Sequence, residues 1–288
     1  MRSPARPPEH FAVAAHPQIP EAGELAEVIA RHLRQAGLKA DHASLQDDSL
    51  KGLIQSGGVD ILIALGGDGT MLRAGHLCAP SRVPILGINL GRFGFLTEVR
   101  RDQWQPVLEK VRAGEFWLEQ RMMLRADLLR GGKPAGDWEV LNECLVGRGQ
   151  MVRPVRLITE IDGRTLTTYV ADGLIAATAT GSTAYALAAG GPILPPELRN
   201  ILLVPVAPHL SVDRAIVLHE GSTVSITVRT THEASLSADG GAPVHLEDGD
   251  RVDVRAADVA AEFVRLQDPG YFYRNLTSRM NQNPAAEA

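Results

Sequence analysis

The sequence predicts an α/β N-terminal domain with a parallel sheet, followed by a β-rich C-terminal domain. Short apolar runs alternate with helical patterns up to about residue 113. Beyond that point, extended runs follow one another at short intervals and are separated by turn residues. A chain of 288 residues is also long for a single hydrophobic core. Two domains are therefore the favoured interpretation, and one large domain is the alternative.

The first domain opens with a strand at residues 11–15. A helix follows, in which apolar side chains recur at helical spacing before Gly37, namely Leu25, Val28, Ile29 and Leu33. Further elements follow in order: a strand near residues 39–43, an apolar run at 60–65, a loop at 66–70, a helix beginning near Met71, a strand at 83–89 and a helix at 103–113. Strands that alternate with helices are typical of a parallel sheet.

The second domain is predicted from extended runs at residues 141–146, 155–161, 174–177, 201–206, 223–228 and 251–254. Residue types that tolerate positive φ separate extended segments, as in Arg130-Gly131-Gly132, Asp162-Gly163, Asp239-Gly240-Gly241 and Asp248-Gly249-Asp250. We place the domains at residues 1–105 and 106–265. Residues 266–288 form a C-terminal segment that is a candidate to pack back on the first domain, with a disordered tail. The proline-rich leader MRSPARPPEH is also expected to be disordered.

Charge and composition exclude several classes of protein. A formal charge of −5 and a pI near 6.0 argue against a general nucleic-acid binder. No run approaches the roughly 20 apolar residues of a membrane span, and the chain start lacks a signal-peptide pattern, so we expect no membrane partner and a cytoplasmic location. Cys78 and Cys144 match no disulfide or metal spacing and are expected to be small, buried, reduced residues. The histidines show no HxxxH spacing.

The loop between the run at 60–65 and the following helix is the strongest candidate site. It reads Gly66-Gly67-Asp68-Gly69-Thr70, and ligands bind open parallel sheets at the carboxyl ends of strands. Glycines allow main-chain amides to approach a phosphate, and a helix N-terminus favours an anion. Asp68 would then either hold Mg²⁺ against phosphate oxygens or accept the proton of an attacking hydroxyl. A tight turn with Asp68 as a helix cap is the alternative.

A second loop rich in glycine and hydroxyl groups lies at residues 171–195. A strand leads through Thr180-Gly181-Ser182-Thr183 into a helix of small residues, which leaves room for a flat ligand, while Thr183 and Tyr185 offer hydroxyls. The alternative is a closely packed helix, capped by Ser182 or Thr183 and ended by Gly190. Neither a P-loop GxxxxGK[ST] nor a GxGxxG motif occurs in the chain.

Together, these two loops resemble the NAD kinase family, which pairs GGDGT with a later DG…TGSTAY…AGGPI stretch. Three more segments are similar to family motifs: GINLGRFGFLTE at residues 87–98, Asn142-Glu143, and Ser237-Ala238-Asp239-Gly240. The five motifs occur in the family order from about residue 61 to 241. The resemblance implies a fold of the two-domain NAD kinase and diacylglycerol kinase type.

The resemblance also implies a reaction and a set of site residues. The γ-phosphoryl group of ATP would pass, with a divalent metal such as Mg²⁺, to the adenosine ribose 2′-hydroxyl of NAD. Asp68 would be catalytic or would position the metal, and Gly66, Gly67, Gly69 and Thr70 would line the phosphates. The implied NAD-binding residues are Asp68, Phe95, Asn142, Glu143, Asp172, Thr183, Ala184, Tyr185 and Asp239, with Arg148 as a candidate phosphate contact. The bland alternatives are core packing for Phe95, a strand-end cap for Asn142-Glu143, and Asp-Gly turns for Asp172 and Asp239.

Some residues depart from the family pattern. Thr178-Ala179-Thr180 stands where proline is commonly central, Ala188 where serine is frequent, and Gly147 before Arg148 where histidine is frequent. The family resemblance also implies a homo-oligomer, a dimer or a tetramer. Competing hypotheses are a lipid kinase of the diacylglycerol or sphingosine type, which would carry a GTGND-like stretch that this chain lacks, a phosphofructokinase-like sugar kinase, and a catalytically silent nucleotide-binding regulator.

Overall fold

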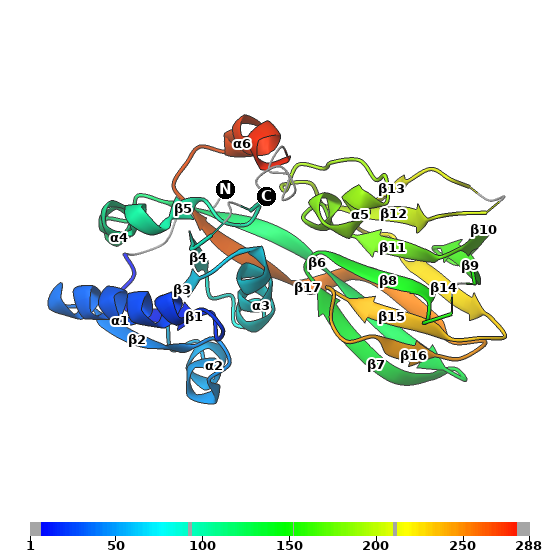
Figure 1. The fold of residues 1–288 in the computed structure, drawn as a ribbon, viewed down its shortest axis with the longest axis horizontal. Coiled ribbons are helices and arrows are strands. Elements are labelled where there is room, and N and C mark those ends of the chain that lie inside the picture. The colour runs from blue at the N-terminus through cyan, green and yellow to red at the C-terminus, as the bar shows by residue number, and fades with distance from the viewer. Residues whose placement is uncertain (1–6, 92–93, 152, 210–211, 281–288) are drawn as a thin grey trace. The chain divides into compact units, whose positions relative to one another are not determined.

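The computed structural model describes residues 7–91, 94–151, 153–209 and 212–280. The chain divides into two compact units, one formed by Met1–Arg121 with Ala260–Ala288 and the other by Met122–Val259 (Figure 1). The chain passes between the units within two long strands, β6 (Trp117–Arg130) and β17 (Arg251–Arg265). The domain limits expected from the sequence, 1–105, 106–265 and 266–288, remain a prediction. The leader and the final tail expected to be disordered fall largely on residues 1–6 and 281–288, outside the described residues.

The first unit contains a parallel sheet in the order β2-β1-β3-β4, in which β4 also pairs with β5 and with the end of β17. The strands are β1 (His10–Ala15), β2 (Lys39–Ser44), β3 (Ile61–Leu65), β4 (Ile85–Asn89) and β5 (Val99–Arg100). Strands β3 and β4 are buried along their whole length, as expected for strands covered on both faces. The predicted parallel sheet is confirmed.

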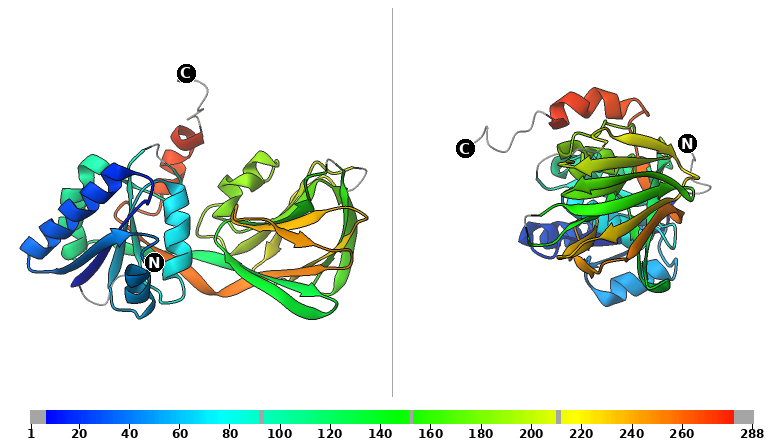
Figure 2. Two further views of the ribbon diagram at one scale, coloured as in Figure 1. Left: turned by 60° about the horizontal axis from the view of Figure 1, so that its bottom comes forward. Right: turned by 90° about the vertical axis from the view of Figure 1, so that its right-hand side faces the viewer.

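Helices cover both faces of this sheet (Figure 2). The helices of this unit are α1 (Pro20–Gln35), α2 (Asp48–Gln55), α3 (Asp68–Cys78), α4 (Trp104–Arg112) and α6 (Tyr271–Met280), with a short 3-10 turn η1 (Arg101–Gln103) before α4, and α6 does not lie on either face (Figure 1). Apolar side chains of α1 and α4 form one core with alternate residues of the strands, including Phe11 and Val13. On the other face, Gly87 of β4 lies against Met71 of α3, where a Cβ would come within 2.6 Å of the sulfur.

Three helical features differ from the sequence-based expectation. Helix α3 begins at Asp68 rather than near Met71, because the N–H groups of Thr70 and Met71 already donate to the carbonyl of Gly67. Helix α2 was not predicted, although the Asp47 carboxylate caps it by accepting the N–H groups of Ser49 and Leu50. Helix α6 was not predicted as a helix either.

The second unit is built from two antiparallel sheets. One has the order β10-β9-β14-β17-β6-β7 and the other β13-β12-β11-β8-β15-β16. Their remaining strands are β7 (Lys133–Val140), β8 (Glu143–Arg148), β9 (Val155–Ile161), β10 (Arg164–Ala171), β11 (Gly173–Ala177), β12 (Asn200–Val206), β13 (Ile216–His219), β14 (Val224–Arg229), β15 (Ala234–Ala238) and β16 (Val244–Leu246). The predicted β-rich domain is therefore confirmed.

Alternate apolar residues of both sheets pack into one core, as Ile201 and Leu203 of β12 illustrate. The intervening residues Leu202 and Val204 pack on the opposite face, against the short helix α5 (Tyr185–Ala188). Residues of the predicted turns have positive φ, including +52° at Asp162 and +48° at Asp239.

Both cysteines are free and completely buried, as predicted. Burial raises the pKa of the Cys144 thiol to about 12. Among the described helices, none is both long enough and apolar enough to cross a membrane.

Candidate functional site

In the first unit, the carboxylate of Asp68 is held by the backbone of a second segment. It lies in the first turn of α3, directly after β3, and accepts the N–H of Phe95 at Oδ2 (2.7 Å) and the N–H of Leu96 at Oδ1 (3.1 Å). Gly94 lies so close that a Cβ there would be 2.1 Å from Asp68 Oδ1. Only glycine at residue 94 therefore allows this segment to lie on the carboxylate.

The glycines around Asp68 have different surroundings. A Cβ at Gly66 would lie 2.1 Å from the Thr70 hydroxyl, whereas a Cβ at Gly67 or Gly69 would meet nothing within 4 Å. Gly67 and Gly69 thus border open space beside the first turn of α3, where helix N–H groups have no partner within the helix. The Thr70 side chain is 2% exposed, and its hydroxyl has no hydrogen-bond partner in the described part of the chain.

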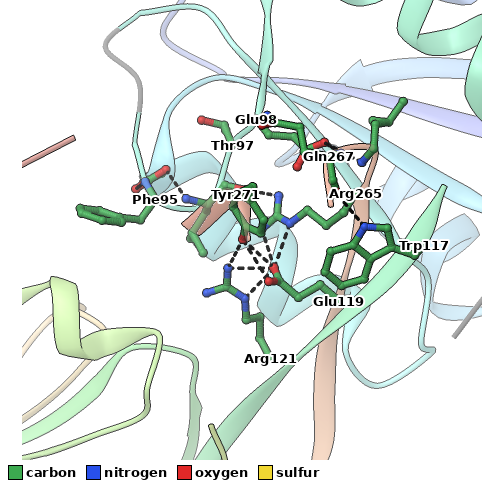
Figure 3. Close-up of polar contacts among 12 residues, drawn as sticks. Phe95, Thr97, Glu98, Trp117, Glu119, Arg121, Arg265, Gln267 and Tyr271 are labelled. Carbon is green, nitrogen blue, oxygen red and sulfur yellow. Dashed lines mark hydrogen bonds and ion pairs between the residues drawn. The ribbon is translucent and has the colours of Figure 1, made fainter. Parts of the chain in front are cut away.

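A group of buried charged side chains lies next to the segment that contains Phe95 and Thr97 (Figure 3). Glu119 accepts hydrogen bonds from Arg121 Nε (2.9 Å), Arg265 Nε (2.8 Å) and the Tyr271 hydroxyl (3.0 Å). Burial by itself would raise the pKa of Glu119, but the two guanidinium groups outweigh burial and lower it to about 2. Arg265 also donates to the carbonyl of Leu96 at 2.9 Å, so this group is connected to the segment that holds Asp68.

In the second unit, Asp239 organises the Asn142-Glu143 motif. Asp239 follows β15, and its carboxylate accepts the N–H groups of Leu141 (2.6 Å), Asn142 (2.8 Å) and Glu143 (2.9 Å). In return, the N–H of Asp239 donates to the carbonyl of Glu143 at 2.9 Å. These contacts fix the backbone from which the Asn142 and Glu143 side chains project.

The loop at residues 178–185 folds onto the same backbone. The N–H of Thr178 donates to the Asn142 carbonyl (2.9 Å), and a Cβ at Gly181 would lie 2.1 Å from that oxygen. The Ser182 hydroxyl donates to Ala179 and accepts from Leu194, so Ser182 does not cap a helix. The helical part is shorter than expected: a 3-10 turn, η2 (Gly181–Thr183), followed by the four residues of α5. Tyr185 is 44% exposed.

The carboxyl group of Glu143 has a raised pKa. Burial and the negative charge of Asp239 raise its pKa to about 7, and the backbone N–H of Tyr185, which donates to the carboxylate, reduces the increase. Its Oε2 atom is buried and has no hydrogen-bond partner among the described residues. A buried, unpartnered oxygen of this kind is suited to a ligand hydroxyl.

Two other candidate residues pair with each other at the far end of the same strands. Arg148 Nε lies 3.2 Å from Asp172 Oδ2, and the Arg148 N–H donates to the Asp172 carbonyl. Glu143 pairs with Ala177 and Gly147 with Gly173 in the antiparallel β8–β11 ladder. Arg148 lies five positions after Glu143 along β8, about 17 Å away at the usual rise of about 3.3 Å per residue. Gly147 is required here because a Cβ would lie 2.7 Å from the Asp172 carbonyl.

Within each unit, the structure gathers most of the predicted residues. Asp68 and the Phe95 backbone come together in the first unit, while Asn142, Glu143, Asp239 and residues 183–185 come together in the second. Asp172 and Arg148 form a separate pair. Phe95 is half-buried, with its ring 6.4 Å from that of Phe272 in α6. Arg92 and Phe93 of the GINLGRFGFLTE segment lie outside the described residues.

A metal would have few protein ligands at Asp68. In the stretches 7–91, 94–151, 153–209 and 212–280, no three His, Cys, Asp or Glu side chains gather as a metal-binding group. Mg²⁺ commonly binds through one or two carboxylates together with substrate phosphates and water. Each Asp68 oxygen accepts one N–H of the 95–96 backbone, and a carboxylate oxygen has a second lone pair that can bind a cation. The residues therefore fit a metal that is carried mainly by the nucleotide.

Sequence reasoning missed the residues that support Asp68. In the sequence, Gly94 is recognisable only as part of the GINLGRFGFLTE motif. No local pattern marks Arg265, Glu119 and Tyr271, because they come together across about 150 residues of chain. Asp239 was expected as a ligand contact, and its observed contacts are with backbone amides.

Comparison with known proteins agrees with this geometry. Residues 22–116 match the ATP-NAD kinase N-terminal domain, and residues 141–266 match the ATP-NAD kinase C-terminal domain. The NAD kinase of Chloroflexus aurantiacus is 43% identical over 224 residues, covering 78% of this chain and 81% of that protein. The NAD kinase of Dehalococcoides mccartyi is 38% identical over 270 residues, covering 93% and 94%.

Solved structures show the same fold. An NAD kinase from Archaeoglobus fulgidus in complex with ATP superposes with a TM-score of 0.75 at 25% identity, covering 93% of this chain and 98% of that one. Yeast NADH kinase complexed with NADH has a TM-score of 0.83 at 24% identity, covering 97% and 89%, and shows a likeness of fold. From the two matched domains and the identity to these relatives over most of its length, the chain belongs to the NAD kinase family.

Proposed function

We propose that this protein is an NAD kinase, which transfers the γ-phosphoryl group of ATP to the 2′-hydroxyl of the adenosine ribose of NAD and so forms NADP. Family membership supports the reaction, and relatives with this name cover most of the chain. The observation that carries the assignment of the site is the Asp68 carboxylate, held by two backbone amides at the start of α3 and bordered by open glycines.

The phosphates of ATP are proposed to bind at the first turn of α3. A side chain at Gly67 or Gly69 would meet open space there, and the positive end of the helix dipole favours an anion. Gly66 and the buried Thr70 would hold the loop in shape, because Gly66 lies directly against the Thr70 hydroxyl on the buried side of the loop. The loop would thus hold phosphates mainly through its backbone.

Asp68 is proposed to act on the attacking hydroxyl. The ribose 2′-oxygen forms a bond to the γ-phosphorus, the bond from that phosphorus to the bridging oxygen of ADP breaks, and the hydroxyl proton passes to Asp68 as base. The alternative role is to hold Mg²⁺, which when bound would neutralise charge on the phosphates. In either role, the amides of Phe95 and Leu96 fix the direction of the carboxylate.

The NAD molecule is proposed to contact Asn142, Glu143, Thr183, Ala184 and Tyr185. The unpartnered Glu143 oxygen and the Asn142 amide can pair with ribose hydroxyls and base groups, which are both donors and acceptors. Asp239 would support this contact by holding the backbone of residues 141–143. Phe95 would lie against the adenine, and Asp172 would meet the nicotinamide end, with Arg148 beside it.

Two further expectations are part of the proposal. The family resemblance favours a homo-oligomer, either a dimer or a tetramer, which size-exclusion chromatography with light scattering would measure. We also expect the protein to act in the cytoplasm.

The direct test is an assay of the purified full-length chain with Mg-ATP and NAD, in which NADP is followed with an NADP-specific dehydrogenase. We expect formation of NADP that depends on both substrates, and parallel reactions with other triphosphates, polyphosphate and NADH define the preferences. A protein that binds both nucleotides by calorimetry and forms no NADP would instead be a silent nucleotide-binding regulator.

A further inference from the structure

The segment 94–98 is held on both sides of its backbone. Two of its N–H groups, those of Phe95 and Leu96, donate to Asp68. Its carbonyl groups accept from two arginines: Leu96 from Arg265 at 2.9 Å, and Thr97 from Arg279 at 3.1 Å. Because each peptide unit is planar, a contact that fixes a carbonyl also fixes the amide bonded to it. Those two contacts fix the peptide units just after the amides that face Asp68. Arg279 also donates to the Phe95 carbonyl at 3.4 Å, which shares its peptide unit with the Leu96 N–H, so Arg279 helps to determine where that amide points.

Arg279 reaches this segment from α6, near the end of the chain. Tyr271, Asn275 and Arg279 recur every four residues and so share one face of the helix. The Arg279 guanidinium donates through Nη2 to Thr97 and through Nη1 to the Phe95 carbonyl, the latter at 3.4 Å. Its Cζ atom also lies 5.7 Å from the centre of the Phe95 ring and 5.8 Å from that of Tyr271. One side chain thus contacts both the backbone and the ring of residue 95.

Arg279 is buried, so its contacts must offset the free energy needed to remove its charge from water. The residue is 7% exposed, and burial lowers the pKa of its guanidinium, while the negative charge of Asp68 acts in the opposite direction. Its hydrogen bonds to carbonyl groups and the attraction between its charge and the faces of two aromatic rings offset part of this free energy. A guanidinium can donate to two carbonyls at once because its N–H groups form a planar fork, and a lysine ammonium lacks that fork.

Arg265, the other arginine, also forms an ion pair with a buried carboxylate. Arg265 is 1% exposed and pairs with Glu119, so its substitution would leave this buried carboxylate with one guanidinium partner, Arg121, in place of two, and would destabilise the unit. Arg279 contacts the carbonyls of residues 95 and 97 directly. It is therefore the residue through which the position of the segment can be tested separately from folding.

We propose that Arg279 is a positioning residue for phosphoryl transfer, which fixes the segment 94–98 through the Phe95 and Thr97 carbonyls and thereby holds the Leu96 amide, with Phe95 beside it, against the Asp68 carboxylate. This inference rests on the proposed function of Asp68 in the reaction. It assigns a role in the reaction to the C-terminal helix, which lies about 200 residues beyond the glycine-rich loop in the sequence.

The test compares three full-length variants: Arg279→Met, which keeps much of the volume and removes the fork, Arg279→Lys, which keeps the charge, and Arg274→Met as the control. Arg274 lies on the same helix, is half exposed and pairs with Asp268. We expect kcat to fall about 10- to 100-fold in Arg279→Met, less in Arg279→Lys, and not in Arg274→Met, with KM for NAD nearly unchanged. An unchanged kcat in Arg279→Met, a change confined to KM, or an equal loss in Arg274→Met would overturn the proposal.

A double-mutant cycle with Asp68→Asn shows whether Arg279 acts through Asp68. If it does, Arg279→Met reduces the single-turnover rate in the wild-type background and has little further effect in the Asp68→Asn background. Losses that multiply in the double variant would contradict the proposal.

Hydrogen exchange supplies a readout that needs no activity. In Arg279→Met, or in Arg279→Lys if the methionine variant folds poorly, the amides of Phe95 and Leu96 should exchange faster while those of β3 and β4 stay protected. Unchanged exchange of these two amides would also overturn the proposal. A wild-type chain without NADP formation would refute the proposed function, and the exchange result would still decide whether Arg279 holds the segment.

Discussion

The backbone N–H of Glu143 donates to the carboxylate of Asp239 at 2.9 Å, so that two acidic residues lie side by side in the second unit. The contact holds the Glu143 backbone in place and also brings a negative charge close to its side chain. Burial and that charge raise the pKa of Glu143 to about 7, from an ordinary value of 4.5. The charge of Glu143 in the candidate NAD site is therefore expected to change with pH near neutrality.

The first prediction is that Glu143 makes the folded chain less stable as the pH rises from about 5 to 8. The folded state binds the proton more tightly than the unfolded state, so the stabilisation is complete below about pH 4.5 and is lost as the pH rises through about 7. The loss is at most about 3 kcal/mol, and water around the partly exposed side chain reduces it. Urea unfolding at several pH values measures the free energy of unfolding.

Glu143→Gln should remove this contribution, because glutamine resembles the protonated carboxyl at every pH. Glu24→Gln, at an exposed position of α1, is the matched control and should keep the wild-type slope. Other buried acids, such as Glu98 with its raised pKa, contribute equally to all three proteins. Identical slopes for wild type and Glu143→Gln would show that Glu143 is ionised normally.

The second prediction concerns recognition of NAD by Asn142. Asn142→Ala should weaken NAD binding by about 1–3 kcal/mol, because a ligand group loses its hydrogen-bond partner on binding. The change should appear as a raised KM with a smaller effect on kcat. Asn200→Ala removes an amide that donates to Leu218 within the same unit, and it should leave KM unchanged. Calorimetry that finds the wild-type affinity for NAD in Asn142→Ala would leave the residue with a structural role.

The third prediction uses the contact between Gly94 and Asp68. Gly94→Ala places a Cβ where the Asp68 carboxylate lies, so the side chain or the segment must move, and kcat should fall about 100-fold. Gly52→Ala on α2 adds the same methyl group in open space and should have wild-type activity. Near-normal kcat in Gly94→Ala would show that the contact does not matter for the reaction.

The general architecture was predictable because its signals are local. Buried runs, turn residues and the glycines around Asp68 each act over a few residues, so the parallel sheet, the β-rich part and the family motifs could be recognised. The long strands β6 and β17 are less visible, since β17 continues well beyond the expected run at 251–254. Its later residues pair with β4, and a single sequence does not show that pairing.

The candidate site was predictable in its residues and less so in its contacts. GGDGT and Asn142-Glu143 were recognised from their motifs, whereas the start of α3 at Asp68 depends on the carbonyl of Gly67. The hydrogen bond from Arg279 to the Thr97 carbonyl connects residues that are 182 positions apart in the sequence. It forms only because of the way α6 packs. Long-range contacts of this kind follow from tertiary packing rather than from local residue preference.

The last prediction concerns Asp68 itself. A carboxylate beside phosphate-binding amides would repel ATP unless a metal or the hydroxyl proton makes use of its charge. Asp68→Asn keeps the shape and removes the charge, and the amide oxygen can still accept one of the N–H groups of residues 95 and 96. We expect kcat to fall by roughly 10²–10⁴, with the melting temperature and NAD binding near wild type. A titration with Mg²⁺ separates the two roles, because a lost metal contact is partly restored at high metal concentration and a lost base is not. A kcat within about threefold of wild type would remove Asp68 from the mechanism, and the GGDGT sequence would then be a structural turn between β3 and α3.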